Sequence, residues 1–447
     1  MTQQVEGERI TRVTVFTEAE FAAALDTAPK FVLTVGPDTL LFPALVNAHT
    51  HLAMGALRGI TDGDAFTGNV VEDLFFRIET ALTREDVRAF ARMGCWEALL
   101  AGTGSVWEHY YFADAIAEAF LDTGMTGTIA PTLQDVSGPG LALASCGWED
   151  TLRTTLSIHH NDTLRTKGVV AALGPHATDT VSPSLWQTVA KMAEEHALPI
   201  HAHVAQSIEE FERIRDRHGC SPVEFLQRNS VLNCSAPMLL VHSMYLSESD
   251  INLLRPDRHT LGLCPASAVQ FGFPCHYAGW RAAGLPVALG TDACCSNDNM
   301  DVQGELRLLA GGGIFGVASS EPHAAFFTGA RAGCDAEAAA VQETRQELLA
   351  AGSEFNQPLE LLKTVTTTPG NMHPGLAVTP VYASCGPWIC FLLILRILSA
   401  HACRSPCGGD PARVLGQPVV CQAATPKHVA QRRTLAWSLF FRVGACH

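Results

Sequence analysis

Short apolar runs that each end in a polar residue recur along this chain and indicate its architecture. Examples are Leu-Val-Asn-Ala-His-Thr-His, Leu-Pro-Ile-His-Ala-His, Met-Leu-Leu-Val-His and Leu-Pro-Val-Ala-Leu-Gly-Thr-Asp. Each run has the length and composition of a strand that is buried on both faces of a parallel sheet. The polar residues at or near the ends of these runs are His49, His51, His176, His203, His242 and Asp292.

Amphipathic segments of helical length separate the apolar runs. We expect helices near residues 83–101, 182–196, 208–217, 247–254, 277–283 and 302–310, and further strands near 105–109, 126–131 and 168–173. Thr83 is suited to cap the first of these helices. Strands that alternate with helices form βαβ units, and eight such units close into a (β/α)8 barrel. We predict an α/β fold of this TIM-barrel type, since the chain from His49 to Asp292 has close to the roughly 250 residues of one barrel.

The His-x-His pair at the end of the first run is the strongest chemical signal. Residues two apart on a strand point to the same side, so His49 and His51 place two imidazoles together. Imidazole suits zinc, iron and nickel, but such a pair also occurs by chance. The other polar strand ends strengthen the interpretation, because the chemistry of a (β/α)8 barrel sits where the carboxyl ends of its strands converge.

The two ends of the chain differ from residues 43–375 in sequence pattern and composition. Residues 1–42 hold strand-like pieces near 10–15 and 31–35 around a helical stretch, which predicts a short accessory β segment. Residues 43–375 carry the barrel pattern. Residues 376–447 hold seven basic residues, one acidic residue (Asp410) and six of the fifteen cysteines, with no clear helix or strand period. We interpret this tail as atypical, either out-of-frame and poorly ordered or a divergent terminal segment.

Composition limits the kinds of partner that the protein is expected to bind. A net charge of −15 disfavours sequence-independent binding to nucleic acid and to acidic membrane surfaces. The scattered, odd-numbered cysteines indicate reduced thiols, and no basic segment followed by an apolar run begins the chain, so we expect a cytoplasmic protein without a signal peptide. Cys294 and Cys295 follow Asp292, where small core residues are the simpler interpretation than metal ligands. A small heterocyclic molecule is the expected partner, and a homo-oligomer is compatible with the sequence.

The order of the motifs resembles the amidohydrolase superfamily in its one-metal form. Within it, the local sequences are most similar to the branch that holds triazine hydrolases and the S-adenosylhomocysteine and methylthioadenosine deaminases. The stretches that carry the resemblance are residues 45–52, 174–176, 200–206, 240–242 and 290–297. The resemblance covers roughly residues 36–375 and implies a barrel flanked by a small β-sandwich built from both termini, of which residues 1–42 are a short half.

The resemblance implies a role for each motif residue. The metal ligands would be His49, His51, His203 and Asp292, which fits a catalytic zinc or iron(II) ion that keeps a position for water. His242 would hydrogen-bond the attacking water or the developing oxyanion, and Asp292 can accept the water's proton. His176 and Glu79 match positions that contact substrate, although Glu79 alone can also be a surface acid of a helix.

Gln206 departs from the family, which carries a glutamate three residues after the third histidine ligand. That glutamate shuttles a proton to the leaving nitrogen, whereas an amide cannot take up a proton near neutral pH. A missing general acid–base typically costs about 10²–10⁴-fold in rate. Three alternatives follow: His242 and Asp292 share the proton transfer, the leaving group is intrinsically good, or the protein is a weakened or inactive relative.

The remaining histidines receive structural interpretations. His201 shares a strand face with His203 and should lie one layer deeper, as a core residue with satisfied hydrogen bonds. We assign no role to His109, His159, His160, His196, His218 and His259, which we expect at the surface or in loops. The sequence thus predicts a metal-dependent hydrolase of a C–N bond in a cyclic amidine or amino-heterocycle. The alternatives are hydrolytic dechlorination of a chloro-heterocycle, a metal-binding pseudoenzyme, and a barrel enzyme without metal.

Overall fold

The computed structural model describes residues 2–6, 9–14, 19, 32–35, 39–61, 69–273, 276–311, 357–373, 392–396 and 419–424. The chain divides into two compact units, one of residues 46–376 and one that joins residues 1–45 to residues 377–447. These limits lie close to the boundaries predicted at residues 42 and 375. The helical stretch predicted between residues 15 and 31, and most of residues 376–447, lie outside the described residues.

The larger unit is a closed (β/α)8 barrel of parallel strands, as predicted. Its strands are β5 (Leu45–His51), β6 (Thr103–Tyr110), β7 (Thr126–Leu133), β8 (Val169–Ala171) with β9 (Gly174–Pro175), β10 (Ile200–Val204), β11 (Met238–His242), β12 (His259–Leu263), and β13 (Val287–Leu289) with β14 (Asp292–Ala293). Neighbouring strands pair in this order. A parallel bridge between Leu173 and Ile200 connects the fourth strand to β10, and β14 pairs with β5 to close the ring.

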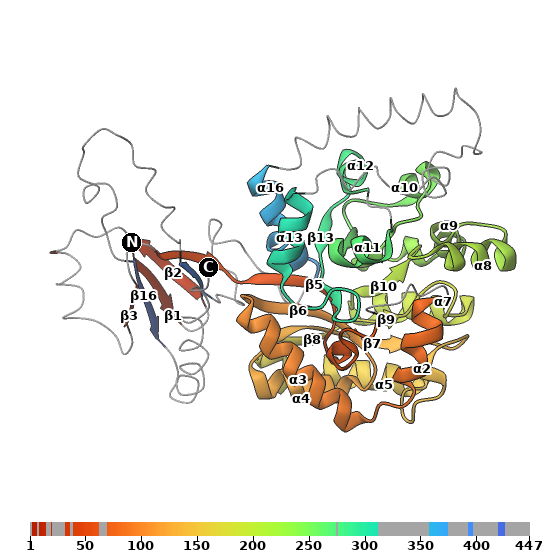
Figure 1. Ribbon diagram of the computed structural model, residues 1–447, viewed down its shortest axis with the longest axis horizontal. Coiled ribbons are helices and arrows are strands. Elements are labelled where there is room, and N and C mark those ends of the chain that lie inside the picture. The colour runs from red at the N-terminus through yellow and green to blue at the C-terminus, as the bar shows by residue number, and fades with distance from the viewer. Residues whose placement is uncertain are drawn as a thin grey trace. The chain divides into compact units, whose positions relative to one another are not determined.

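Helices follow the strands around the barrel (Figure 1). In chain order the longer ones are α3 (Arg84–Leu100), α4 (Ala113–Thr123), α5 (Trp148–His159), α7 (Pro183–His196), α8 (Ile208–His218), α9 (Pro222–Arg228), α11 (Pro265–Phe271) and α13 (Val302–Gly311). Shorter helices are η1 (Leu52–Leu57), η2 (Val71–Phe75), α2 (Phe76–Glu79), η3 (Pro139–Leu141), α6 (Asp162–Thr166), η4 (Val231–Asn233), α10 (Glu248–Leu253), α12 (Tyr277–Ala282), α16 (Pro358–Lys363) and α17 (Thr367–Gly370). Across the described ranges, none of the helices combines the length and apolar character that a bilayer crossing requires.

The predicted helix cap forms in the structure. The Thr83 hydroxyl accepts a hydrogen bond from the backbone N–H of Asp86, and the Asp86 carboxylate accepts one from the backbone N–H of Thr83. This reciprocal pair satisfies two backbone donors that α3 would otherwise leave free. All six predicted helices are present, whereas α4, α5, α9, α11 and the strand β12 were not predicted.

The seam between the first and last strands is held by side chains near the predicted ligands. Asn47 donates from Nδ2 to the Thr291 hydroxyl at 2.8 Å and accepts from the Thr291 backbone N–H at 3.0 Å. Gly290 is required at this seam, because a Cβ there would lie 2.6 Å from Cβ of His49. The close approach brings β14 beside β5, so that Asp292 aligns with Thr50, between the two histidines of the first strand.

The smaller unit contains strands from both ends of the chain. Strand β16 (Val419–Ala424) pairs with β1 (Thr2–Glu6) in parallel and with β3 (Val32–Val35) antiparallel, and β2 (Arg9–Thr14) borders β1. Strand β15 (Leu392–Arg396) pairs with β4 (Thr39–Pro43). Strands β15 and β16 lie in residues 376–447, where no helix or strand period was recognised in the sequence. The atypical origin of this tail stays a prediction.

Candidate metal centre and substrate pocket

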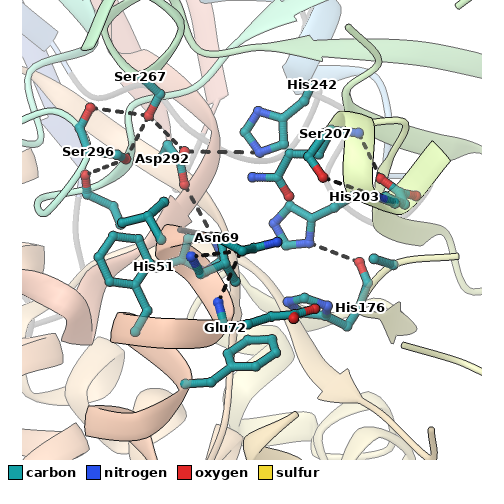
Figure 2. A pocket seen from close by; sticks show the side chains of 18 of the residues that line it. His51, Asn69, Glu72, His176, His203, Ser207, His242, Ser267, Asp292 and Ser296 are labelled. Carbon is teal, nitrogen blue, oxygen red and sulfur yellow. Dashed lines mark hydrogen bonds and ion pairs between the residues drawn. The ribbon is translucent and has the colours of Figure 1, made fainter. Parts of the chain in front are cut away.

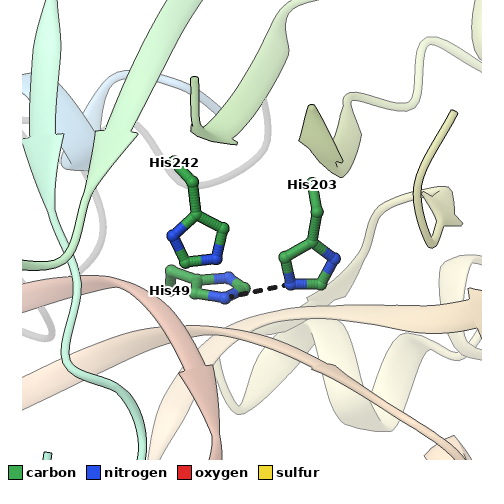
Figure 3. A group of neighbouring side chains, drawn as sticks. All are labelled: His49, His203 and His242. Atoms are coloured by element: carbon green, nitrogen blue, oxygen red, sulfur yellow. Dashed lines mark hydrogen bonds between the residues drawn. The ribbon is translucent and has the colours of Figure 1, made fainter. Parts of the chain in front are cut away.

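The four predicted metal ligands meet at the carboxyl ends of the barrel strands. The Nε2 atoms of His49 and His51 lie 3.5 Å and 3.4 Å from Oδ1 of Asp292. Nε2 of His203 lies 3.3 Å from Nε2 of His49. Figure 3 shows the rings of His49 and His203 facing one space, with His242 above them. Residues from β5, β10 and β14 therefore gather around His49, whose ligand nitrogen lies within 4.8 Å of ligand atoms of His51 and Asp292 in one group, and of His203 and His242 in a second group.

Each of the three imidazole ligands is oriented through its other ring nitrogen. Nδ1 of His51 lies 2.5 Å from the carbonyl oxygen of His109, and Nδ1 of His203 lies 2.9 Å from that of His176. A carbonyl can only accept, so both rings carry their proton on Nδ1 and present a free lone pair on Nε2. Nδ1 of His49 lies 2.8 Å from Nε2 of His201, a pair in which either ring nitrogen can carry the proton; the proton on Nδ1 of His49 is the arrangement that leaves its Nε2 free for a metal. This pattern of supporting acceptors is typical of metal-binding histidines.

Burial keeps these imidazoles neutral. Desolvation lowers the pKa of His49 to about 3, and the neighbouring charge of His51 lowers it further, while the hydrogen bond with Asp292 opposes the shift. Desolvation also lowers the pKa of His51 and, well below its ordinary value, that of His203. Burial alone would raise the pKa of Asp292, but its hydrogen bond with His49 and the nearby imidazoles outweigh burial, so its pKa is lowered. Neutral imidazoles beside an ionised carboxylate are the protonation states that bind a cation.

One carboxylate oxygen of Asp292, Oδ1, faces the ligand nitrogens, and the other, Oδ2, contacts neighbouring protein side chains. Its Oδ2 accepts a hydrogen bond of 2.8 Å from the Ser267 hydroxyl, which also contacts Ser296 (Figure 2). Oδ2 also lies 4.0 Å from Nε2 of His242. The backbone of Asp292 is left-handed, with φ of 60°. Such strain is retained where surrounding contacts hold a functional side chain in place.

His242 ends β11 beside the ligands, but its ring is not held by the protein. The residue is 1% exposed, and within the described ranges neither ring nitrogen has a hydrogen-bond partner. Its pKa is lowered to about 4 by burial, with Asp292 opposing the shift. A buried, neutral and unpaired imidazole at the edge of the centre is suited to bind a group of the substrate or an attacking water.

The centre opens into a cavity of about 510 Å³. His51, His203, His242 and Asp292 line it from the barrel side. Figure 2 shows their side chains directed into this space. Aromatic and apolar residues also line it; they are Met54, Phe75, Phe76, Tyr110, Tyr111, Met244, Phe271 and Phe273. A concave apolar site with a few polar groups is typical of a small-molecule pocket.

Both predicted substrate contacts, His176 and Glu79, line this cavity. Glu79 is 4% exposed, so it is not a surface acid of its helix. Burial raises its pKa to about 7, and the nearby Tyr110 hydroxyl opposes the shift. The ring of His176 lies 5.5 Å from that of Phe76 between centroids, and its Nδ1 lies 3.0 Å from the Thr180 hydroxyl. The two residues offer polar groups at the apolar wall of the pocket.

Gln206 also lines the cavity, at the position where the family carries a glutamate. Its backbone N–H donates to Oε2 of Glu210 at 2.7 Å, and the Thr178 hydroxyl donates to Oε1 of the same carboxyl. Burial raises the pKa of Glu210 to about 7, with Asp179 contributing in the same direction. Glu210 thus stabilises the turn that carries Gln206, and both of its carboxyl oxygens accept hydrogen bonds from the protein.

Some residues around the centre have environments that the sequence analysis did not predict. His109 and His259 are buried, at 1% and 0% exposure, so their prediction as surface residues was wrong. Strand β6 carries His109 behind His51, and the unpredicted strand β12 begins at His259. His201 is a buried core residue as expected, but only its Nε2 has a hydrogen-bond partner; its Nδ1 has none among the described residues. Cys294 and Cys295 are buried free thiols. Ser267 carried no sequence signal, because only its position beside Asp292 reveals it.

Comparison with known proteins supports the family resemblance of the sequence motifs. A model of the amidohydrolase family matches residues 40–318, more than half of the chain. The 5-methylthioadenosine/S-adenosylhomocysteine deaminase of Thermococcus onnurineus is 32% identical over 271 residues, which cover 60% of this chain and 62% of that protein. The enzyme of that name from Halothermothrix orenii is 30% identical over 274 residues, 61% of each chain. The match therefore spans less than two thirds of these relatives.

Two solved structures show the same fold. An adenosine deaminase from Xanthomonas campestris with bound zinc superposes with a TM-score of 0.62 at 23% identity, over 81% of this chain and 73% of that chain. A triazine hydrolase from Arthobacter aurescens superposes with a TM-score of 0.60 at 19% identity, over 77% and 73% of the two chains. At these identities the structural match supports the barrel architecture. The chain belongs to the amidohydrolase family.

Proposed function

We propose that this member of the amidohydrolase family is a metal-dependent hydrolase that cleaves a C–N bond of a cyclic amidine or amino-heterocycle and releases ammonia. The observation that supports the proposal is the convergence of His49, His51 and His203 with Asp292, in which carbonyl acceptors on Nδ1 of His51 and His203 leave their Nε2 atoms free. The relatives in sequence are named as deaminases of adenine nucleosides, so aminopurine nucleosides are the first substrate class to test.

The donor set fits one divalent ion, with zinc as our first choice and iron(II) as the second. Three imidazole nitrogens and one carboxylate oxygen match the ligands that zinc takes in catalytic sites, and iron(II) accepts the same donors. When bound, such an ion supplies Lewis acidity that lowers the pKa of a water molecule toward neutrality. The ionised carboxylate of Asp292, held by Ser267 through Oδ2, is placed to accept the proton of that water.

The remaining residues bind and orient the heterocycle. His242 offers a ring nitrogen to the oxygen or nitrogen that becomes negative as water adds to the ring carbon. Glu79 and His176 fix the polar edge of the substrate, and the aromatic side chains of the cavity stack on its faces and exclude bulk water. The proton needed by the departing amine passes from Asp292 or His242, because Gln206 cannot supply one.

Gln206 favours a second candidate, hydrolytic release of chloride from a chloro-heterocycle. Chloride leaves without a proton, so this reaction needs no general acid on the leaving-group side. A pseudoenzyme that binds the heterocycle without turnover is the third possibility. All three candidates use the same metal centre and pocket.

One experiment separates these possibilities. The full chain, saturated with zinc, is incubated with matched amino- and chloro-substituted purines, pterins and triazines, and ammonia and chloride release are measured. Deaminase activity predicts ammonia from an aminopurine nucleoside, and its abolition by His203→Ala would link turnover to the centre. Chloride release without ammonia supports dechlorination. No product from any compound, together with tight heterocycle binding, would contradict both enzyme proposals.

A cytoplasmic location and assembly into a homo-oligomer are further proposals. The location is supported by seven buried free thiols between residues 95 and 295. The net charge of −15 supports a small-molecule partner and disfavours nucleic acid.

A further inference from the structure

Three histidines outside the pocket form a second cluster, the α5–α7 cluster, on the helices that surround the barrel. His159 is the last residue of α5, His160 follows it directly, and His196 is the last residue of α7. One ligand nitrogen from each ring lies within 4.8 Å of the other two. None of the three lines the catalytic cavity. The cluster therefore joins two helices that are separate in sequence and is distinct from the centre described above.

We propose that the α5–α7 cluster is a second metal site, which takes a divalent first-row transition ion such as Zn²⁺ and links the ends of α5 and α7. Three neutral imidazoles suit zinc, copper and nickel, and discriminate against magnesium and calcium, which prefer oxygen ligands. Water molecules would complete the coordination, because the three histidines supply one nitrogen each.

The geometry needs only a small contraction to bind an ion. With zinc–nitrogen bonds of about 2.0–2.1 Å, the nitrogens of a tetrahedral site lie roughly 3.3 Å apart, compared with separations of up to 4.8 Å here. The ring centroids of His159 and His160 are 4.8 Å apart, and that of His196 lies 6.2 Å and 6.0 Å from them. His160 is exposed and the other two are partly exposed, so side-chain rotation can close the gap.

The imidazoles are available as ligands. In the part of the chain that the structure describes, no hydrogen bond or ion pair engages their ring nitrogens, and their rings contact one another. Desolvation and the neighbouring rings of His160 and His196 lower the pKa of His159, which favours the neutral, metal-binding form. The surrounding protein thus does not compete with an ion for the nitrogens.

The backbone around the cluster also favours a cation. His159 and His196 each end a helix, and the carbonyl groups of the last turn place partial negative charge at a helix C-terminus. Arg165 acts in the opposite direction, since it contributes to lowering the pKa of His159, but its guanidinium is paired with Asp162. An ion bound here would cross-link the helices that follow the third and fourth strands and would stabilise the folded state.

The test is the zinc content of the full chain after equilibrium dialysis at micromolar free zinc. We expect the wild-type protein to retain one more zinc per chain than the double variant His160→Gln/His196→Gln. The matched control is His218→Gln, which removes an exposed histidine in the same last-turn position of α8 that belongs to no histidine cluster among the described residues. The control should bind as much zinc as wild type.

A second readout follows from linkage. Added zinc should raise the melting temperature of a protein whose catalytic centre is already saturated, and it should not do so in the double variant. Because the prediction is a difference of one equivalent between two proteins, it holds whether or not the catalytic centre binds metal. Equal zinc content in wild type and the double variant, or an equal loss in His218→Gln, would overturn the site.

Discussion

Nδ1 of His49 lies 2.8 Å from Nε2 of His201, so a ligand on the first strand is oriented by a core histidine on the fifth. His201 is completely buried and lies one layer below His203 on the same face of β10. With Nε2 of His201 as the acceptor, His49 carries its proton on Nδ1, and this core residue orients a ligand.

Replacing His201 by Phe should weaken metal binding while the barrel still folds. The substitution keeps an aromatic ring but removes the acceptor, so the His49 ring can rotate or move its proton to the ligand nitrogen. Loss of such a supporting partner typically costs about 10–100-fold in metal affinity. Zinc competition with a chromophoric chelator measures the change. His201→Gln, which retains an acceptor, should lose less. Equal affinity in the wild type and His201→Phe would exclude the orienting role.

Gly290→Ala should distort the metal centre, although Gly290 is not one of the ligands. The added Cβ would lie 2.6 Å from Cβ of His49 and 2.7 Å from its backbone nitrogen, so β5 and β13 must separate. Overpacking of this kind costs typically about 1–3 kcal/mol of stability. We expect a lower melting temperature and weaker zinc binding. The control is Gly304→Ala in α13, where a Cβ meets nothing within 4 Å and should stabilise the helix. A Gly290→Ala protein with unchanged stability and zinc affinity would show that the seam does not position His49.

Gln206→Glu should increase ammonia release, if deamination is the reaction. The new carboxyl restores a group that can carry a proton to the leaving nitrogen, for which the gain is about 10²–10⁴-fold. Chloride release should change little, because that leaving group needs no proton. Steady-state rates with matched amino- and chloro-substrates measure both. Glu209→Gln, at another residue that lines the pocket, is the control and should leave the ratio of the two rates unchanged. An equal effect of Gln206→Glu on both reactions would contradict the proton-transfer argument.

Glu305 should make the stability of the protein depend on pH. Burial raises its pKa to about 8 from an ordinary value of 4.5, although hydrogen bonds from Ala266 and Asn297 oppose the shift. The folded protein therefore keeps a proton that the unfolded chain loses. Its contribution to stability is full below pH 4.5 and is lost as the pH rises through 8. Urea unfolding across this range should show a steeper fall for wild type than for Glu305→Gln, by at most about 1.4 kcal/mol per pH unit. Parallel curves would refute this account of Glu305.

The barrel and its ligands could be predicted from sequence because their signals are local. Apolar runs that end in His or Asp mark both a buried strand and its carboxyl end, so His203 and Asp292 were recognised as strand-end residues, while their roles as ligands came from the family resemblance. Strand β12 was missed because His259 begins it and a glycine interrupts its short apolar pattern. His109 and Ser267 were not recognised, since their importance depends on contacts across the barrel that no local pattern contains.

The most direct test of the central claim is an anomalous-diffraction map of zinc-loaded protein, collected at the zinc edge. The account predicts a strong peak at the carboxyl ends of the strands, within bonding distance of Nε2 of His49, His51 and His203 and of a carboxylate oxygen of Asp292. Full zinc loading without a peak among these four side chains would contradict it.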